Sequence, residues 1–286
     1  MESKHLSVTL SGEAGVAGRA GEAGAVAVVT LDRPPVNAVS QAMYAEIRDL
    51  FGRFDEALPG VKAVVLTGAG RHFCAGNDLD EFLTLDEINA AGRMRLVRDA
   101  FAAIYDCPVP VIGAVRGAAL GTGLAIAACC DVVVAGRSAR FGTPEVGVGV
   151  MGGARHLARL VPQSFVRLMY FTADPVPATD LAGFGSVVQV VDDDQVVAAA
   201  LALAARMTRH SRTALRHAKE SLNAIEFMDL KSGYELEQRM TGRLVAQADA
   251  REAVTALRER RPPAYRDEVP AGNDPDNAAG DTKAPS

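Results

Sequence analysis

Three short segments of the 286-residue chain combine small residues with groups that could do chemistry. They are residues 70–78 (GRHFCAGND), 116–124 (RGAALGTGL) and 141–149 (FGTPEVGVG). Each follows a stretch that has the pattern of a strand, and the loops after strands form the ligand sites of open α/β cores. These three loops are therefore the candidates for a functional site.

The second segment places Gly121 and Gly123 around Thr122, at the start of a predicted helix. The first N–H groups of a helix have no partner within it, and the positive end of the helix dipole lies behind them. Such a turn can bind a phosphate or stabilise a developing oxyanion. Close packing of a helix on a strand would call for the same glycines, so the pattern alone leaves both interpretations open.

Glu145 is a carboxylate among Pro, Val, Gly and Met residues in the third segment. Burial there would raise its pKa toward neutrality, which suits a general base, whereas a solvated loop Glu is the plainer alternative. Residues 147–152 also satisfy the pattern GxGxxG. No strand leads directly into this stretch and Pro144 precedes it, so a nicotinamide cofactor is not expected.

Composition excludes several classes of protein. The formal net charge of −5 leaves no basic excess to neutralise nucleic-acid phosphates. The apolar stretch 117–130 is too short to span a bilayer, and the first ten residues lack the apolar region of a secretory signal. The four cysteines form no CxxC pair and have no His at metal-ligand spacing. We expect no nucleic-acid partner, no membrane association, no metal site, and a cytoplasmic location with reduced thiols.

Strands and helices alternate through the first two thirds of the chain. Ser40 and Asp86 can each cap a helix, the second with Ile88, Val97, Phe101 and Ile104 as its apolar stripe. A small-residue helix is expected at 121–129. The strand-like runs are residues 5–10, 25–31, 62–67, 109–115 and 131–135. This order predicts an α/β core with largely parallel strands, and residues 1–24 add an N-terminal strand with a flexible Gly/Ala-rich loop.

The pattern becomes helical only after about residue 195. These helices must bury their apolar faces, and packing against another subunit is the simplest solution, so we expect a homo-oligomer. The predicted organisation is a core at 25–194, a helical oligomerisation region at 195–261 and a disordered tail at 262–286. The predicted helices are 195–208, 211–225, 230–248 and 251–260.

Four blocks together resemble the crotonase superfamily, the enoyl-CoA hydratases and isomerases. They are LDRPPVNAVS (31–40), VVLTGAGRHFCAGNDLDEF (64–82), PVIGAVRGAALGTGLAIAACCDVVVAG (110–136) and FGTPEVGVG (141–149), and the likeness runs from about residue 5 to residue 261. The resemblance implies the crotonase (ClpP-like) α/β spiral of ββα units with a C-terminal helical region. It also implies a homotrimer, or a hexamer built as a dimer of trimers.

The resemblance also implies what each candidate residue does. The substrate is an acyl-CoA thioester, with coenzyme A as part of the substrate and no other cofactor. The backbone N–H groups of Asn77 and Thr122 form the oxyanion hole, and Glu145 is the catalytic carboxylate. Arg260 of the last helix would reach the CoA of a neighbouring subunit, whereas Asp80 replaces a lysine frequent in the family. The implied CoA-binding residues are Arg33, Val36, Ala38, Ala75, Gly76, Asn77, Asp78, Leu79 and Thr122.

One departure from the family pattern bears on the reaction. Ala125 stands where hydratases carry a second catalytic Glu, so hydration is expected to be impaired. A single base can still move a proton between C2 and C4, which favours isomerase-like chemistry. The alternatives are a catalytically silent acyl-CoA binding protein, or another lyase or hydrolase acting on a cyclic acyl-CoA. In the last case His156, which replaces a small residue, would be an auxiliary acid or base.

Overall fold

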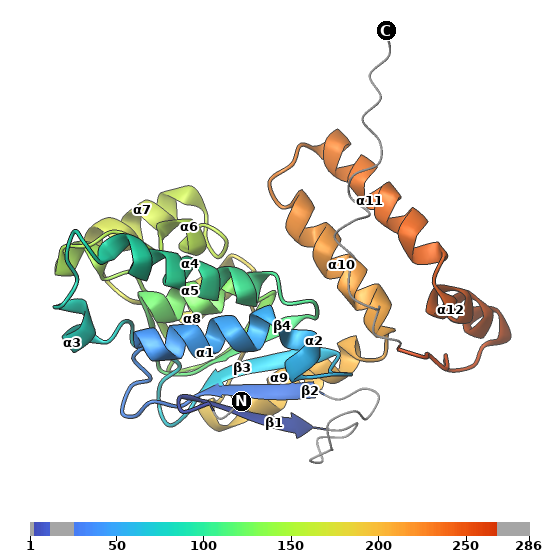
Figure 1. Ribbon diagram of the computed structural model, residues 1–286, viewed down its shortest axis with the longest axis horizontal. Helices are drawn as coiled ribbons and strands as arrows, with labels where there is room; N and C mark the ends of the chain where they lie inside the picture. Colours follow the sequence, from blue (N-terminus) through green and yellow to red (C-terminus); the bar gives the residue numbers. More distant parts are fainter. Residues whose placement is uncertain (1–2, 12–25, 268–286) are drawn as a thin grey trace, which may run out of the picture.

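The computed structural model describes residues 3–11 and 26–267 of the chain. Within these residues the larger sheet has six strands in the order β1-β2-β3-β4-β6-β9, and all pairs are parallel except β1 with β2 (Figure 1). The predicted strand-like runs 5–10 and 25–31 thus pair with each other, and the loop between them, 12–25, lies outside the described residues. The strands are β1 (Leu6–Ser11), β2 (Val26–Leu31), β3 (Ala63–Gly68), β4 (Val111–Val115), β6 (Val132–Gly136) and β9 (Val187–Val191).

Helices cover both faces of this sheet, which explains why its central strands are continuous apolar runs such as AVVLTG in β3. The helices α1 (Gln41–Gly52), α4 (Ala90–Tyr105) and α5 (Thr122–Cys129) lie on one face (Figure 1). The helix α9 (Val196–Met207) packs on the other through Val196, Ala200 and Ala204. α9 is therefore part of the core, although the sequence analysis assigned its residues to the C-terminal oligomerisation region.

The start of α4 differs from the sequence prediction. Ser40 caps α1 as expected, accepting a hydrogen bond from the Met43 N–H. Asp86, however, accepts from the N–H groups of Ile88 and Asn89 in a preceding turn, and α4 begins only at Ala90. Ile88 consequently lies outside the helix and is 94% exposed, so its expected place in the apolar stripe was wrong.

A small second sheet brings two of the candidate loops to one edge. Its strands are β5 (Ala118–Leu120), β7 (Arg140–Gly142) and β8 (Val176–Pro177), in that order. Because β5 and β7 are parallel, their carboxyl ends lie side by side, and the Gly121 N–H donates to the Gly142 carbonyl over 2.9 Å. The glycine turn before α5 and the loop that carries Glu145 therefore start from neighbouring points.

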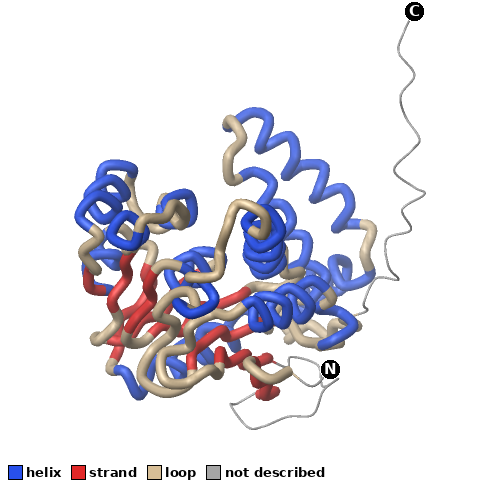
Figure 2. Tube along the Cα trace, turned by 60° about the vertical axis from the view of Figure 1, so that its left-hand side comes forward, coloured by secondary structure: helices blue, strands red, loops and turns tan. Residues whose placement is uncertain are grey.

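The last three helices stand off the sheet, to one side of the core (Figures 1 and 2). Buried ion pairs attach α10 (Arg212–Ile225) to the core: Lys219 contacts both carboxylate oxygens of Asp131 at 2.6 Å, and Arg212 pairs with Asp55.

The remaining elements are α2 (Phe54–Ala57), α3 (Leu79–Phe82), η1 (Glu145–Val148), α6 (Ala154–Leu157), α7 (Gln163–Thr172), α8 (Ala178–Gly183), η2 (Asp193–Gln195), α11 (Leu230–Val245) and α12 (Ala248–Glu259). Among the described residues, no helix is both long and apolar enough to cross a membrane.

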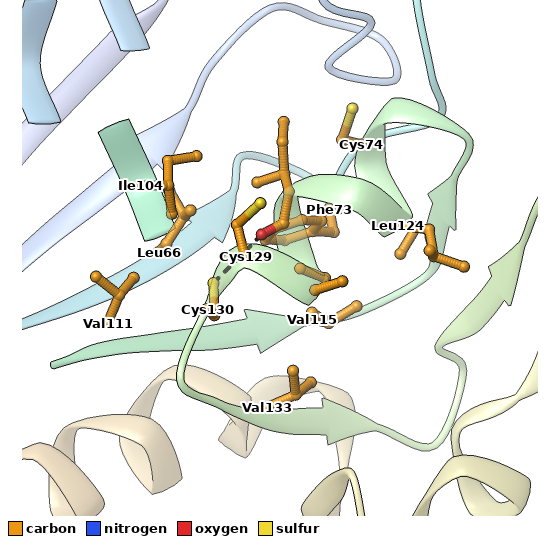
Figure 3. Packing of buried hydrophobic residues seen from close by; sticks show 14 of the residues in the cluster. Leu66, Phe73, Cys74, Ile104, Val111, Val115, Leu124, Cys129, Cys130 and Val133 are labelled. Atoms are coloured by element: carbon orange, nitrogen blue, oxygen red, sulfur yellow. Dashed lines mark hydrogen bonds between the residues drawn. The ribbon is translucent and has the colours of Figure 1, made fainter. Parts of the chain in front are cut away.

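The cysteines belong to the packed interior. Figure 3 shows Cys129 and Cys130 at the end of α5, among Leu66, Val111 and Val133. Burial raises the pKa of the Cys129 thiol to about 12, so it stays protonated at neutral pH. These thiols fill core volume and are not set up as nucleophiles.

Candidate active site

Short backbone bonds join the loop that carries Asn77 to the start of α5. The Cys74 N–H donates to the Ala118 carbonyl over 2.9 Å, and the Leu120 N–H donates to the Cys74 carbonyl over 3.0 Å. A Cβ added at Gly123 would overlap the Cys74 carbonyl oxygen, so only glycine permits this approach. The Gly-rich spacing in the sequence therefore reflects close contact between two loops.

We expect Gly123→Ala to lower the free energy of unfolding by about 2–3 kcal/mol, because the added methyl group must displace backbone. Urea unfolding at one protein concentration measures the change. Gly242→Ala is the matched control, since nothing lies within 4 Å of a Cβ at that position in α11. It should be neutral or slightly stabilising. Equal unfolding midpoints for the two variants would contradict the close packing.

Two main-chain N–H groups are unpaired where these loops meet. Asn77 lies opposite Val39 in a parallel bridge, but the bonds of that bridge use the Gly76 carbonyl and the Asp78 N–H. Thr122 is the first residue of α5, so its N–H has no partner within the helix. Across the described residues, neither amide has an acceptor. Both are therefore free to donate to a ligand, as the sequence analysis expects of an oxyanion hole.

The side chains of the same two residues meet at a buried tyrosine that the sequence analysis did not single out. The Tyr44 hydroxyl donates to Asn77 Oδ1 over 2.6 Å and lies 2.7 Å from Thr122 Oγ1. Thr122 Oγ1 also donates to Asn77 Oδ1 over 3.0 Å, which closes a triangle. Burial raises the pKa of Tyr44, so its proton is retained. The triangle fixes the two amide-bearing residues relative to each other.

We expect Tyr44→Phe to reduce kcat about tenfold with little change in KM. Removing the hydroxyl costs a hydrogen bond worth about 1 kcal/mol and loosens the spacing of the two amides. Steady-state kinetics on an accepted thioester measures this split. Tyr234→Phe, which removes an exposed hydroxyl from α11, should change neither constant. A Tyr44→Phe variant with the kcat of the wild type would show that the triangle does not position the amides.

Glu145 begins the η1 turn and is 8% exposed. Its carboxylate lies against two glycine turns. A Cβ added at Gly121 would lie 3.4 Å from Glu145 Oε1, and a Cβ added at Gly153 would lie 3.0 Å from the same oxygen. Its other oxygen, Oε2, is buried without a hydrogen-bond partner. Burial raises the pKa of Glu145, partly offset by a bond to its own backbone. A desolvated, under-bonded carboxylate beside the start of α5 fits a general base.

The residues expected to hold CoA lie together. The Ala75 N–H donates to the Val36 carbonyl over 3.0 Å, and the Val39 N–H donates to the Gly76 carbonyl over 2.8 Å, so residues 33–38 and 75–79 form one surface. This surface includes Ala38 and Leu79. Arg33 is not a free cation there, because its guanidinium pairs with Asp78 and donates to the Ala38 carbonyl. The hydrogen bond from the Glu81 N–H, by which Asp78 caps α3, and then the pair with Arg33 lower the pKa of Asp78.

Arg260, His72 and Ala125 do not add a side chain to this surface. Arg260 ends α12, which packs on α10 and α11, far across the molecule from α3 (Figure 1). The chain by itself therefore does not bring Arg260 to the expected CoA surface. His72 accepts a hydrogen bond from the Ala118 N–H over 3.1 Å, which is a structural role in the loop. Ala125, which stands at the expected position of the second carboxylate, is buried in α5.

His156 lies in α6, three residues after Gly153. Its ring packs edge-on against Phe101 at 5.0 Å between centroids, and the Phe101 ring packs in turn on Tyr44 at 6.0 Å. Burial and the nearby Arg159 and Arg155 lower the pKa of His156, so its imidazole is neutral at pH 7.

Across residues 3–11 and 26–267, no group of three or more His, Cys, Asp or Glu is placed to hold a metal ion.

An α/β core that carries two unpaired amides and one buried carboxylate on adjoining loops suits an enzyme in which an oxyanion forms beside a base. The comparisons agree. The family model described as "Enoyl-CoA hydratase/isomerase" matches residues 21–268. The chain therefore belongs to this family, within the crotonase superfamily, whose members act on CoA thioesters.

Individual relatives differ in the reaction that their names state. The chain is 41% identical over 220 residues to a (7aS)-7a-methyl-1,5-dioxo-2,3,5,6,7,7a-hexahydro-1H-indene-carboxyl-CoA hydrolase of Rhodococcus jostii (strain RHA1), covering 76% of this chain and 84% of the relative. It is 34% identical to a 2,3-dehydroadipyl-CoA hydratase of Escherichia coli (strain K12), covering 84% and 95%. The crystal structure of an enoyl-CoA hydratase from Bacillus anthracis superposes with a TM-score of 0.83 at 27% identity, covering 93% and 100%. The expected crotonase fold is confirmed.

Proposed function

We propose that the protein moves a proton on an enoyl-CoA thioester, with Glu145 as the one acid-base group and the amides of Asn77 and Thr122 as the oxyanion hole. The observation that carries this proposal is the buried Glu145 carboxylate next to Gly121, together with Ala125 in place of a second carboxylate. Addition of water normally needs two such groups. Migration of a double bond needs only one.

The reaction follows from this arrangement. The thioester oxygen accepts hydrogen bonds from the two amides, which makes the C2 proton of a 3-enoyl-CoA more acidic. Glu145 takes that proton, and the electron pair of the C–H bond forms a dienolate whose charge is on the oxygen. The same carboxyl returns the proton at C4, so the double bond moves from C3–C4 to C2–C3. No atom is gained or lost.

The second candidate is hydrolytic cleavage of a cyclic 3-oxoacyl-CoA, favoured by the 41% identity to a hydrolase of a bicyclic dioxo thioester. Glu145 would take a proton from water as its oxygen attacks the ring ketone. The carbon–carbon bond to C2 then breaks, and its electron pair forms the thioester enolate in the same oxyanion hole. Return of that proton to C2 completes the addition of one water and leaves an open ring with a new carboxylic acid, which then loses its proton to the solvent.

A further part of the proposal concerns assembly. Residues 195–261 were expected to pack against other subunits, but α9 covers the sheet of its own core, so only the helices α10 to α12 remain for that role. These helices leave large apolar side chains exposed, which supports their packing against other subunits as a trimer or hexamer. Arg260 would then approach the CoA of a neighbouring subunit. The exposed side chains include Leu222, Leu230, Tyr234, Val254 and Leu257.

One experiment in D2O separates the candidates. The protein is incubated with 3-hexenoyl-CoA, with crotonyl-CoA and with the thioester of 2-oxocyclohexanecarboxylic acid, and the products are followed by mass spectrometry. We expect 2-hexenoyl-CoA with little hydration of crotonyl-CoA. Ring opening with gain of one water would establish the second candidate instead. Binding of these thioesters without turnover or deuterium exchange would identify a silent acyl-CoA binding protein.

The rate should depend on pH through Glu145. Since the base must be ionised and burial raises its pKa, kcat/KM should fall on acidification with a midpoint above the ordinary glutamate value of 4.5. The measurement is kcat/KM for 3-hexenoyl-CoA between pH 4 and pH 8, with circular dichroism at each pH to show that the protein stays folded. A flat profile over that range would contradict the assignment of Glu145 as the base.

A further inference from the structure

A cavity of about 270 Å³ lies where α4, α6 and the end of α10 meet, beside the candidate active site. Phe101 lines it and also packs on Tyr44 of the triangle, and His156 of α6 lines it on the same side. Two aromatic rings in contact, Phe101 and Tyr44, therefore connect the wall of this cavity to Asn77 and Thr122. Its walls are largely apolar and aromatic, which suits the remote part of an acyl group.

Three arginines line this cavity: Arg98 from α4, and Arg155 and Arg159 from α6 and the residues just after it. Arg159 is held in place, since it pairs with Glu226 over 2.9 Å and donates to the Ala128 carbonyl. Neither Arg98 nor Arg155 has a carboxylate partner in the described part of the chain. Arg155 lies instead over the Phe227 ring, 4.1 Å from its centroid.

The positive charge of the cavity is not neutralised from its other walls. Glu226 is already shared between Arg159 and the Tyr105 hydroxyl, to which it lies at 2.7 Å. Lys219, which lies near the Tyr105 ring, is paired with Asp131. The remaining ring, His156, is uncharged at neutral pH. Two guanidinium groups beside an apolar wall therefore lack an anion, and guanidinium is the side chain best suited to bind a carboxylate.

Resting on the proposed function, we infer that this cavity binds a carboxylate at the far end of the acyl group, so that the substrate class is an acyl-CoA with a terminal carboxylate. Arg98 and Arg155 are the recognition residues, and Phe101 and Tyr105 line the apolar approach. Arg159 positions the wall. The amides of Asn77 and Thr122 bind the thioester end of this substrate, and the two guanidinium groups bind the carboxylate at its far end.

The test compares binding of matched thioesters that cannot be isomerised. Saturated acyl-CoAs of six, eight and ten carbons are titrated calorimetrically beside the same chains with a terminal carboxylate. At the length that spans the two sites, the carboxylate should tighten binding by tenfold or more in the wild type. Arg98→Gln and Arg155→Gln should each reduce this preference to about threefold or less. Binding of CoA alone should not change.

Arg95→Gln is the matched control, because Arg95 lies on the same helix, is exposed and pairs with Asp99. It should keep the full preference for the terminal carboxylate. If plain and carboxylated chains bind the wild type equally at every length, the inference about the cavity is wrong while the proposed function stands. If the wild type binds none of the thioesters and exchanges no deuterium into 3-hexenoyl-CoA, the proposed function itself fails.

Discussion

Replacing Glu145 by Gln should lower kcat/KM for isomerisation of 3-hexenoyl-CoA by about 10³-fold, within the range that a positioned acid-base group supplies. The amide keeps the size of the side chain but cannot accept the C2 proton. Since Glu145 Oε2 has no hydrogen-bond partner, no structural bond at that oxygen is lost. The variant should therefore fold normally and bind the saturated thioester with an affinity within about threefold of the wild type.

Two further variants make this result specific. Glu145→Asp retains an acid but withdraws it by one methylene, so we expect an intermediate loss. Glu235→Gln, at an exposed position of α11, should have no effect. Kinetics and calorimetry on the same preparations separate loss of chemistry from loss of binding. Full activity in the Gln variant would mean that the base is elsewhere, with His156 as the next residue to change.

The sequence predicts the parts of this site that are encoded in contiguous loops. Gly121 and Gly123 are informative because a close loop contact and a helix start both require them, and Glu145 because burial among its apolar neighbours would desolvate its carboxylate. The alternation of strands and helices likewise predicts the core, since a parallel sheet covered on both faces needs continuous apolar strands. Each of these signals is local in the chain.

The features that the sequence does not predict depend on contacts between distant elements. Tyr44 looks like one more apolar-face residue of α1, and only the packing of α1 near the start of α5 places its hydroxyl between Asn77 and Thr122. Arg98 and Arg155 are two of many charged helix residues until α4 and α6 meet. Ile88 was misassigned because the helical period continues through the Asp86 turn, although the helix does not.

The backbone donor of Thr122 can itself be removed. Proline has no N–H, and the first position of a helix is where proline is best tolerated. Thr122 occupies that position in α5, and Gly121 before it has the conformational freedom to precede a proline. We therefore expect Thr122→Pro to fold and to lower kcat by about 10²- to 10³-fold, the loss that follows removal of one oxyanion donor.

The proline also removes the Thr122 hydroxyl, so Thr122→Val is the necessary control. Valine keeps the N–H and the branched shape but loses the bonds to Tyr44 and Asn77. It should resemble Tyr44→Phe, with about a tenfold loss of kcat. Circular dichroism and binding of a saturated acyl-CoA show whether each variant is folded. Because a side-chain role would make the two variants equally poor, a much larger loss in Thr122→Pro assigns the difference to one main-chain hydrogen bond.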